Sequence, residues 1–221
     1  RRHNGMKMQL LVLIIALLFA GVGNLAYGLP KVDKYFRLSG QARAFWNKPW
    51  VIGLIAGVAV GTAVIVRFGS INLLLLFPLL TLGTVLSVID AGTQRLPRSM
   101  TLTFLILVVT VVILAGFITG QWVKPAYALI VAIGSFILLL PGTFVRHGIG
   151  AGDLRLVPLL VGLATCSSWH SLLLMGILSV VGSGLWALYL VTVKKASSAT
   201  RFAFGPWLLA ATYIALLVVP R

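Results

Sequence analysis

Long apolar runs separated by short, basic connectors constrain the fold of this chain more than any other feature. Hydrophobic residues make up 60% and charged residues 10% of the 221 residues, whereas a soluble domain is about half apolar and about a quarter charged. The candidate membrane spans are 10–27, 51–66, 71–90, 99–118, 125–140, 153–166, 169–192 and 204–219. We therefore predict an all-α, polytopic membrane helix bundle with about eight transmembrane helices. Several runs are short against the roughly 20 residues that cross a bilayer, so six or seven is the alternative.

We expect two parts in the chain. Residues 1–50 are predicted to hold a first transmembrane helix at 10–27 and a cytoplasmic connector at 29–50. The connector mixes cations with aromatic side chains, a composition typical of the lipid headgroup zone, so part of it is expected to form an interfacial helix. Residues 51–221 are predicted to form the membrane-embedded core. The single cysteine, Cys166, cannot form an internal disulfide and offers no metal-ligand spacing, so we expect neither a metal nor a cofactor.

The strong positive charge of the chain belongs to its connectors. A net charge of +15 would suit a nucleic-acid partner, but the basic residues do not form a solvated face. We therefore expect no nucleic acid and instead predict contact with anionic lipids. Alternate connectors differ sharply in base content, which places the richer set in the cytoplasm. Besides the bases of 29–50, the richer set holds Arg95, Arg98, Arg146, Arg155, Lys194, Lys195 and Arg201, whereas the internal connectors of the other set hold only Arg67 and Lys124.

Carboxylates are scarce, and their positions suggest a site. The three acidic residues are Asp33, Asp90 and Asp153. Asp33 lies in the basic connector and is expected to be a surface residue, whereas Asp90 closes one apolar run and Asp153 opens another. A charged side chain at a membrane segment is costly and suggests a function. The chain crosses the membrane twice between these two acids, so both are expected at the same, cytoplasmic boundary.

Two carboxylates at one boundary can hydrolyse a peptide bond. The ionised group takes a proton from water while the protonated group polarises the carbonyl, and two like charges at close range share one proton. Three glycines, Gly148, Gly150 and Gly152, precede Asp153. They permit positive φ angles and the close approach of another chain, such as an extended peptide substrate. The alternative is a flexible loop in which Asp153 is a simple N-cap.

A short loop and a Leu-Pro pair follow the other acid. After Asp90 the chain runs to Leu96 and Pro97 and then into the next apolar run. Proline suits the first position of a helix because its missing N–H would have no partner there. Ser99 or Thr101 is expected to cap this helix.

Taken together, these motifs resemble the type IV prepilin peptidases, the bacterial branch of the GxGD membrane aspartic proteases, in a short form without the Cys-rich cytoplasmic domain. The resemblance covers about residues 51–219. Its motifs are Asp90 with Leu96-Pro97 and Thr101, then Gly150-Ala151-Gly152-Asp153-Leu154-Arg155-Leu156, and finally Phe204-Gly205-Pro206. The resemblance implies that Asp90 and Asp153 are the catalytic pair. It also implies supporting or substrate-binding roles for Gly150, Gly152, Leu96, Pro97, Thr101 and Arg155.

The family implies an aspartic endopeptidase at the bacterial inner membrane. Such enzymes remove a short basic leader from prepilin or pseudopilin substrates at the cytoplasmic face. This chain departs from the family pattern at Arg98, where an acid or Asn is usual, and at Arg155, where Lys is usual. Bifunctional members also N-methylate the new N-terminus and carry a Cys-paired, zinc-binding domain after the first helix. The connector at 29–50 has no cysteine, so N-methyltransferase activity is not expected.

Two other classes of function compete with the peptidase. A transporter or proton relay would use Asp90 and Asp153 to carry ions, and it predicts acids in mid-span and repeated, interrupted helices. Both acids instead lie at the ends of spans, and the sequence shows no clear repeat. A catalytically inactive homologue that acts in pilus assembly is the second alternative. The sequence does not indicate an oligomeric state.

Overall fold

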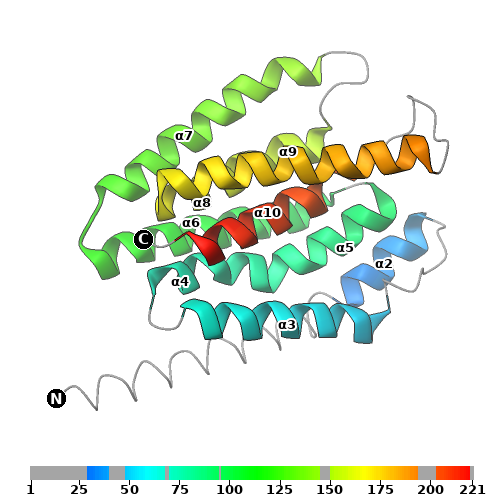
Figure 1. Ribbon diagram of the computed structural model, residues 1–221, viewed down its shortest axis with the longest axis horizontal. Helices are drawn as coiled ribbons and strands as arrows, with labels where there is room; N and C mark the ends of the chain where they lie inside the picture. The colour runs from blue at the N-terminus through cyan, green and yellow to red at the C-terminus, as the bar shows by residue number, and fades with distance from the viewer. Residues whose placement is uncertain are drawn as a thin grey trace.

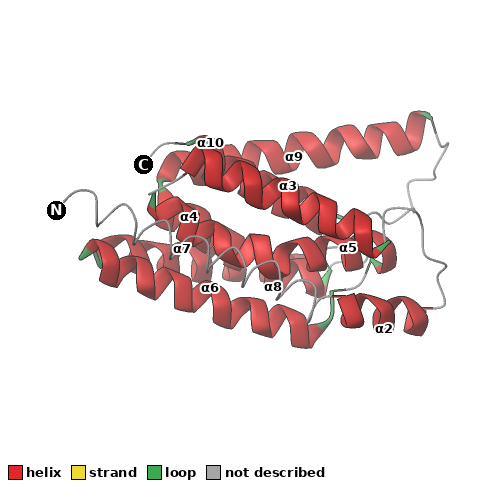
Figure 2. Ribbon diagram, turned by 90° about the horizontal axis from the view of Figure 1, so that it is seen from below, coloured by secondary structure: helices red, strands yellow, loops and turns green. Residues whose placement is uncertain are grey.

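The computed structural model describes residues 29–39, 48–67, 70–94, 96–144, 150–193 and 203–219, and every secondary-structure element in these segments is a helix (Figures 1 and 2). The helices are α2 (Leu29–Ser39), α3 (Pro49–Arg67), α4 (Ile71–Pro78), η3 (Leu79–Gly83), α5 (Thr84–Thr93), α6 (Arg98–Thr119), α7 (Val123–Leu139), η4 (Leu140–Thr143), α8 (Ala151–Ser167), α9 (Trp169–Thr192) and α10 (Gly205–Val218). The prediction of an all-α bundle is confirmed.

The lengths of these helices fit a multi-pass membrane protein. The segments long and apolar enough to cross a bilayer are Ile71–Thr93, Arg98–Thr119, Val123–Thr143 and Trp169–Thr192, and Leu54–Arg67 and Gly205–Val218 are shorter apolar helices. The 17-residue α8 matches the remaining predicted span within the core. The predicted span at 10–27 lies outside the described residues. Large apolar side chains are exposed along α6, α7 and α9, as expected of helices that face lipid.

The first long span changes its hydrogen-bond pattern in the middle. Pro78 ends α4, because proline has no N–H to donate and its ring clashes with the preceding turn. The next five residues, Leu79–Gly83, form a π-helix before α5 continues. The Thr81 hydroxyl donates to the carbonyl oxygens of Phe77 at 2.9 Å and Pro78 at 3.2 Å. This supplies a donor at the irregular turn, where lipid offers none.

Helix α10 buries one face against α9, α5 and α8, while α7 packs mainly against α8 at the periphery (Figure 1). The core between these layers is apolar. Its largest fully buried side chains include Phe104, Leu75, Leu86, Ile89, Met100 and Leu160. The predicted interfacial segment contains a helix, α2, which packs against α5 through the buried side chains of Val32 and Phe36.

Buried polar groups hold the C-terminal end of α10. The Asn72 side chain donates to the carbonyl oxygens of Leu216 at 3.3 Å and Val219 at 3.4 Å. Its own oxygen accepts from the Ser167 hydroxyl at 2.9 Å. The Arg67 guanidinium also donates to the Val219 carbonyl. We call Arg67, Asn72 and Ser167 the polar clamp. The last carbonyls of a helix have no partners within it, so the clamp stabilises this end.

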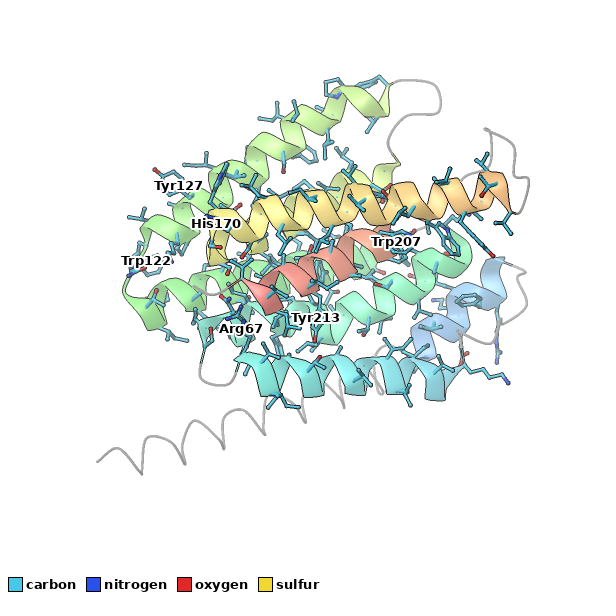
Figure 3. All side chains as sticks on the ribbon, in the orientation of Figure 1. Arg67, Trp122, Tyr127, His170, Trp207 and Tyr213 are labelled. Atoms are coloured by element: carbon cyan, nitrogen blue, oxygen red, sulfur yellow. The ribbon has the colours of Figure 1, made fainter. Side chains whose placement is uncertain are left out.

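A second contact joins α10 to α3 between its two ends. The Tyr213 hydroxyl donates to the Ala59 carbonyl at 2.7 Å and lies 2.5 Å from the Thr62 hydroxyl oxygen. Figure 3 shows Tyr213 near Arg67, with Trp207 toward the other end of α10. Helix α10 is therefore fixed at several points along its length.

Candidate active site

Asp90 lies in the last turn of α5 and is only 5% exposed. The helix ends because Gln94 adopts a left-handed conformation with φ of 51°, and its N–H donates to the Asp90 carbonyl at 2.8 Å. The chain then turns toward Leu96 and Pro97. A buried carboxylate therefore stands at the end of a helix, directly before a tight reversal of the chain.

Helix α6 begins one residue later than the Leu-Pro motif predicted. Pro97 is the N-cap, with φ of −65° and ψ of 129°, and no side chain caps the helix. The expectation that Ser99 or Thr101 is the cap is therefore wrong. The Thr101 hydroxyl instead donates to the carbonyl oxygens of Pro97 at 3.3 Å and Arg98 at 3.0 Å. Its side chain is thus held within the first turn of α6.

Asp153 lies in the first turn of α8 and is partly buried. The N-cap of this helix is Gly150, whose carbonyl accepts the Leu154 N–H at 3.0 Å. The alternative in which Asp153 serves as the N-cap is therefore wrong. The positive φ that glycine permits is used neither at Gly150, which has φ of −67°, nor at Gly152, which is helical. Gly148 lies outside the described residues.

The close approach expected of the glycines does occur at Gly152. A Cβ atom there would lie 3.0 Å from Leu96 Cβ and 3.1 Å from Leu96 Cδ1. Only a residue without a side chain lets Leu96 pack this closely against α8. The loop after Asp90 therefore contacts the helix turn that carries Asp153, which brings the first two sequence motifs together.

The third motif meets the first at Gly205, the first residue of α10. Its N–H donates to Asp90 Oδ2 at 3.1 Å, and both residues are buried. A Cβ atom at Gly205 would lie 2.6 Å from Asp90 Oδ2 and 3.2 Å from Asp90 Cγ. Gly205 is thus a site residue that was not among the predicted ones, although it belongs to the Phe204-Gly205-Pro206 motif.

The two carboxylates belong to helices far apart in the sequence, and the contact between Leu96 and Gly152 brings the loop after one helix against the start of the other. Helices α6 and α7 carry the chain away from Asp90 and back toward Asp153. Two acids placed in this way can share a proton and activate a water molecule. Among the described residues, no three His, Cys, Asp or Glu side chains are grouped so that they could hold a metal.

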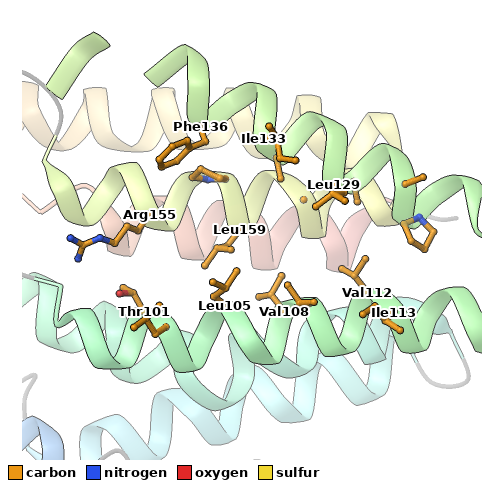
Figure 4. Close-up of a pocket in the computed structure, with 18 of the residues that line it drawn as sticks. Thr101, Leu105, Val108, Val112, Ile113, Leu129, Ile133, Phe136, Arg155 and Leu159 are labelled. Atoms are coloured by element: carbon orange, nitrogen blue, oxygen red, sulfur yellow. The ribbon is translucent and has the colours of Figure 1, made fainter. Parts of the chain in front are cut away.

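Thr101 and Arg155 have a different position from the other predicted site residues. Both line an apolar cavity of about 680 Å³ between α6, α7 and α8 (Figure 4). Thr101 is on α6, which follows the Asp90 motif, and Arg155 is on α8, which carries Asp153. The side chains of Thr101 and Arg155 nevertheless help to form the wall of this cavity, which we call the groove. The site residues therefore form two adjoining groups, one around the carboxylates and one at the end of the groove.

The fold and the site define a polytopic membrane protein with two carboxylates at helix ends, one in the last turn of α5 and one in the first turn of α8. The sequence profile of the Type IV leader peptidase family matches residues 74–188, more than half of the chain, including Asp90 and Asp153. The chain belongs to this family.

One curated relative is the prepilin leader peptidase/N-methyltransferase of Pseudomonas putida, which is 32% identical over 161 residues. The aligned region covers 68% of this chain and 52% of the relative, so the chain spans about half of the relative's length. No solved structure matches the chain. The suspected membership of the prepilin peptidase family is thus confirmed from sequence relatives.

Proposed function

We propose that this protein is an aspartic endopeptidase that removes the short basic leader from prepilin or pseudopilin substrates at the cytoplasmic face of the bacterial inner membrane. The proposal depends on one observation above all: Asp90 and Asp153 come from different helices, and the close contact of Leu96 with Gly152 joins the loop after Asp90 to the helix turn that carries Asp153. In this proposal they are the catalytic pair. The core at 51–221 is the peptidase, and residues 1–50 are the first membrane helix and its connector.

Hydrolysis by the pair needs one ionised and one protonated carboxyl group. The ionised group removes a proton from water, which attacks the scissile carbonyl carbon, and the protonated group donates a hydrogen bond to the carbonyl oxygen. The Gly205 N–H engages Oδ2 of Asp90. This contact fixes the rotation of the carboxyl group and leaves Oδ1 to share the proton or to hold the water.

The depth of the acids supports cleavage at a membrane boundary. Asp90 is in the last turn before the chain reverses, and Asp153 is in the first turn of α8. A proton relay across the membrane would instead need carboxylates in mid-span. A substrate that is apolar within the bilayer and polar outside it presents its junction at the level of these acids. We propose that Gly150, Gly152, Leu96 and Pro97 shape the backbone around this junction.

We further propose that the protein cleaves without methylating. The curated relative is named as both a leader peptidase and an N-methyltransferase. The connector at 29–50 has no cysteine with which to hold a structural zinc. Mass spectrometry of the mature product's N-terminus tests this point, and the mass of one added methyl group would contradict it.

The decisive experiment compares the three aspartates of the chain. A prepilin is co-expressed with the wild type, Asp90→Asn, Asp153→Asn or Asp33→Asn, and loss of the leader is followed by gel mobility. Asparagine has nearly the shape of aspartate but cannot donate or accept the catalytic proton, so each of the first two variants should abolish processing while still accumulating in the membrane. Asp33→Asn is the matched control and should process normally.

Two outcomes would contradict the proposal. Processing by Asp90→Asn or Asp153→Asn would show that the pair is not the catalytic machinery. A wild-type protein that accumulates but leaves the leader in place would instead indicate an inactive homologue with a role in assembly.

A further inference from the structure

A groove in the bundle lies beside the candidate active site. Its walls are α6 and α7, and α8 contributes its floor (Figure 4). The lining is almost entirely apolar, with Leu105, Val109, Leu129, Ile133, Phe136 and Leu159 among its side chains. Leu105 and Ile133 are 37% and 51% exposed, so neither wall is covered by another described part of the chain.

The groove opens toward lipid because α6 and α7 meet closely at one end only. A Cβ atom at Gly116 would lie 3.1 Å from Trp122 and from Pro125, so the helices are in tight contact near their turn. Farther from the turn, α7 packs mainly against α8. Only 11% of the α7 span is buried. A partner held in the bilayer can therefore enter this groove from the side.

One end of the groove lies near the acid motifs. Thr101 and Arg155 lie at this end, whereas Val112 and Ile113 lie toward the other (Figure 4). Arg155 is two residues beyond Asp153, and Thr101 is in the first turn after Pro97. The stretch of α6 from Thr101 to Ile113 is about 18 Å long at 1.5 Å per residue. The groove is thus apolar along roughly half of a ~30 Å core and ends at the level of the candidate active site.

We propose that this groove receives the apolar helix of the substrate, held between α6 and α7, and thereby positions the adjoining peptide bond at Asp90 and Asp153. This inference rests on the proposed function. The occupant is a protein helix because the groove ends beside the acids, where the proposed reaction needs a peptide bond joined to an apolar segment. A substrate of the proposed kind becomes polar at that same depth. Its chain would then continue past the contact between Leu96 and Gly152 to reach the acids.

The test fills the groove and compares two substrates. Ile133→Trp places a bulky ring in the groove, and Ile177→Trp is the matched control on α9, where the isoleucine is 59% exposed and outside the groove. Each purified variant is assayed with a full-length prepilin and with a short peptide that ends just beyond the cleavage site. We expect Ile133→Trp to reduce cleavage of the prepilin at least about tenfold more than cleavage of the peptide, since burial of one aliphatic side chain is enough for that factor. Ile177→Trp should treat both substrates as the wild type does.

Each result bears on a different proposal. Equal losses on both substrates, or no loss on either, would overturn the groove as the helix site. Failure of the wild type to cleave either substrate would instead contradict the proposed function.

A second measurement does not depend on turnover. Benzoylphenylalanine in place of Ile133, in an Asp153→Asn background, should crosslink to the apolar helix of the prepilin, whereas the same probe in place of Ile177 should not. Crosslinks only to lipid, to the first residues of this chain or to a second copy would overturn the proposal.

Discussion

Adding one methyl group at Gly205 provides a sharp test of the candidate active site. In Gly205→Ala the new Cβ would lie 2.6 Å from Asp90 Oδ2, closer than real Cβ contacts come. Because Gly205 begins α10 and is buried among packed residues, the strain must be relieved at the carboxyl group or by a shift of the whole helix. Either movement lengthens the hydrogen bond between the Gly205 N–H and Asp90 Oδ2, now 3.1 Å.

The structure sets the size of the expected effects. A hydrogen bond to a charged group contributes about 1.5–3 kcal/mol, and an extra methylene in a packed interior costs about 1–3 kcal/mol. Both losses arise from the same contact, so we expect the free energy of unfolding to fall by about 2–3 kcal/mol and not by their sum. To relieve the contact, the Asp90 carboxyl group must move by roughly 0.5 Å. A misplacement of about 1 Å can lower a reaction rate about 100-fold, so we expect cleavage to slow by about 10- to 100-fold.

Two other glycines provide the controls in a cleavage assay with purified protein. In Gly182→Ala the new Cβ would lie 2.8 Å from Trp207 Cε3, a comparable clash with α10 that does not involve a carboxylate. In Gly176→Ala it would have no atom within 4 Å. We expect Gly182→Ala to lose stability but much less activity than Gly205→Ala, and Gly176→Ala to resemble the wild type. A folded Gly205→Ala that cleaves at the wild-type rate would refute a role for this contact in positioning Asp90.

Two further predictions follow from contacts elsewhere in the bundle. Gly152→Ala should slow cleavage, because its Cβ would lie 3.0–3.3 Å from three atoms of Leu96. Adding Leu96→Ala in the same chain should restore part of the rate, and strictly additive losses in this double-mutant cycle would contradict the coupling. Asn72→Ala should lower the free energy of unfolding by about 2–4 kcal/mol, because it removes the buried partner of two carbonyls and one hydroxyl. Chemical unfolding in detergent measures this loss, and a kcat that falls as steeply as the stability would show that the polar clamp also acts on the site.

The sequence predicted the elements of the fold well because apolar length is a strong signal in membrane proteins. The described helix Trp169–Thr192 has the predicted bounds, and each predicted span after residue 50 corresponds to a helix or to a run of helices. The positions of Asp90 and Asp153 at helix ends were predicted for the same reason. The π-helix at Leu79–Gly83 was not, since it arises from the packing around Pro78 and leaves the apolar pattern unchanged.

The close contacts of the site were harder to predict, because each depends on three-dimensional packing. Glycines before Asp153 indicated either unusual φ angles or close approach, and only the structure shows that Gly152 serves the second purpose. Gly205 stood in a motif of its own, more than a hundred residues from Asp90, and no periodicity connects the two. Thr101 and Arg155 were given supporting or substrate-binding roles by resemblance, and the structure places them on the wall of the groove.

Helix α10 explains how this membrane bundle can position a carboxylate. At one end, its first N–H binds Asp90. At the other end, Asn72 and Arg67 bind its final carbonyls, and Tyr213 fixes it to α3 between them. Such an arrangement suits lipid, where backbones pack closely through small residues and where unpaired polar groups are costly. The position of Asp90 relative to Asp153 is therefore set by packing across the whole bundle. Substitutions far from the acids, such as those at the polar clamp, should alter the site only when they displace α10.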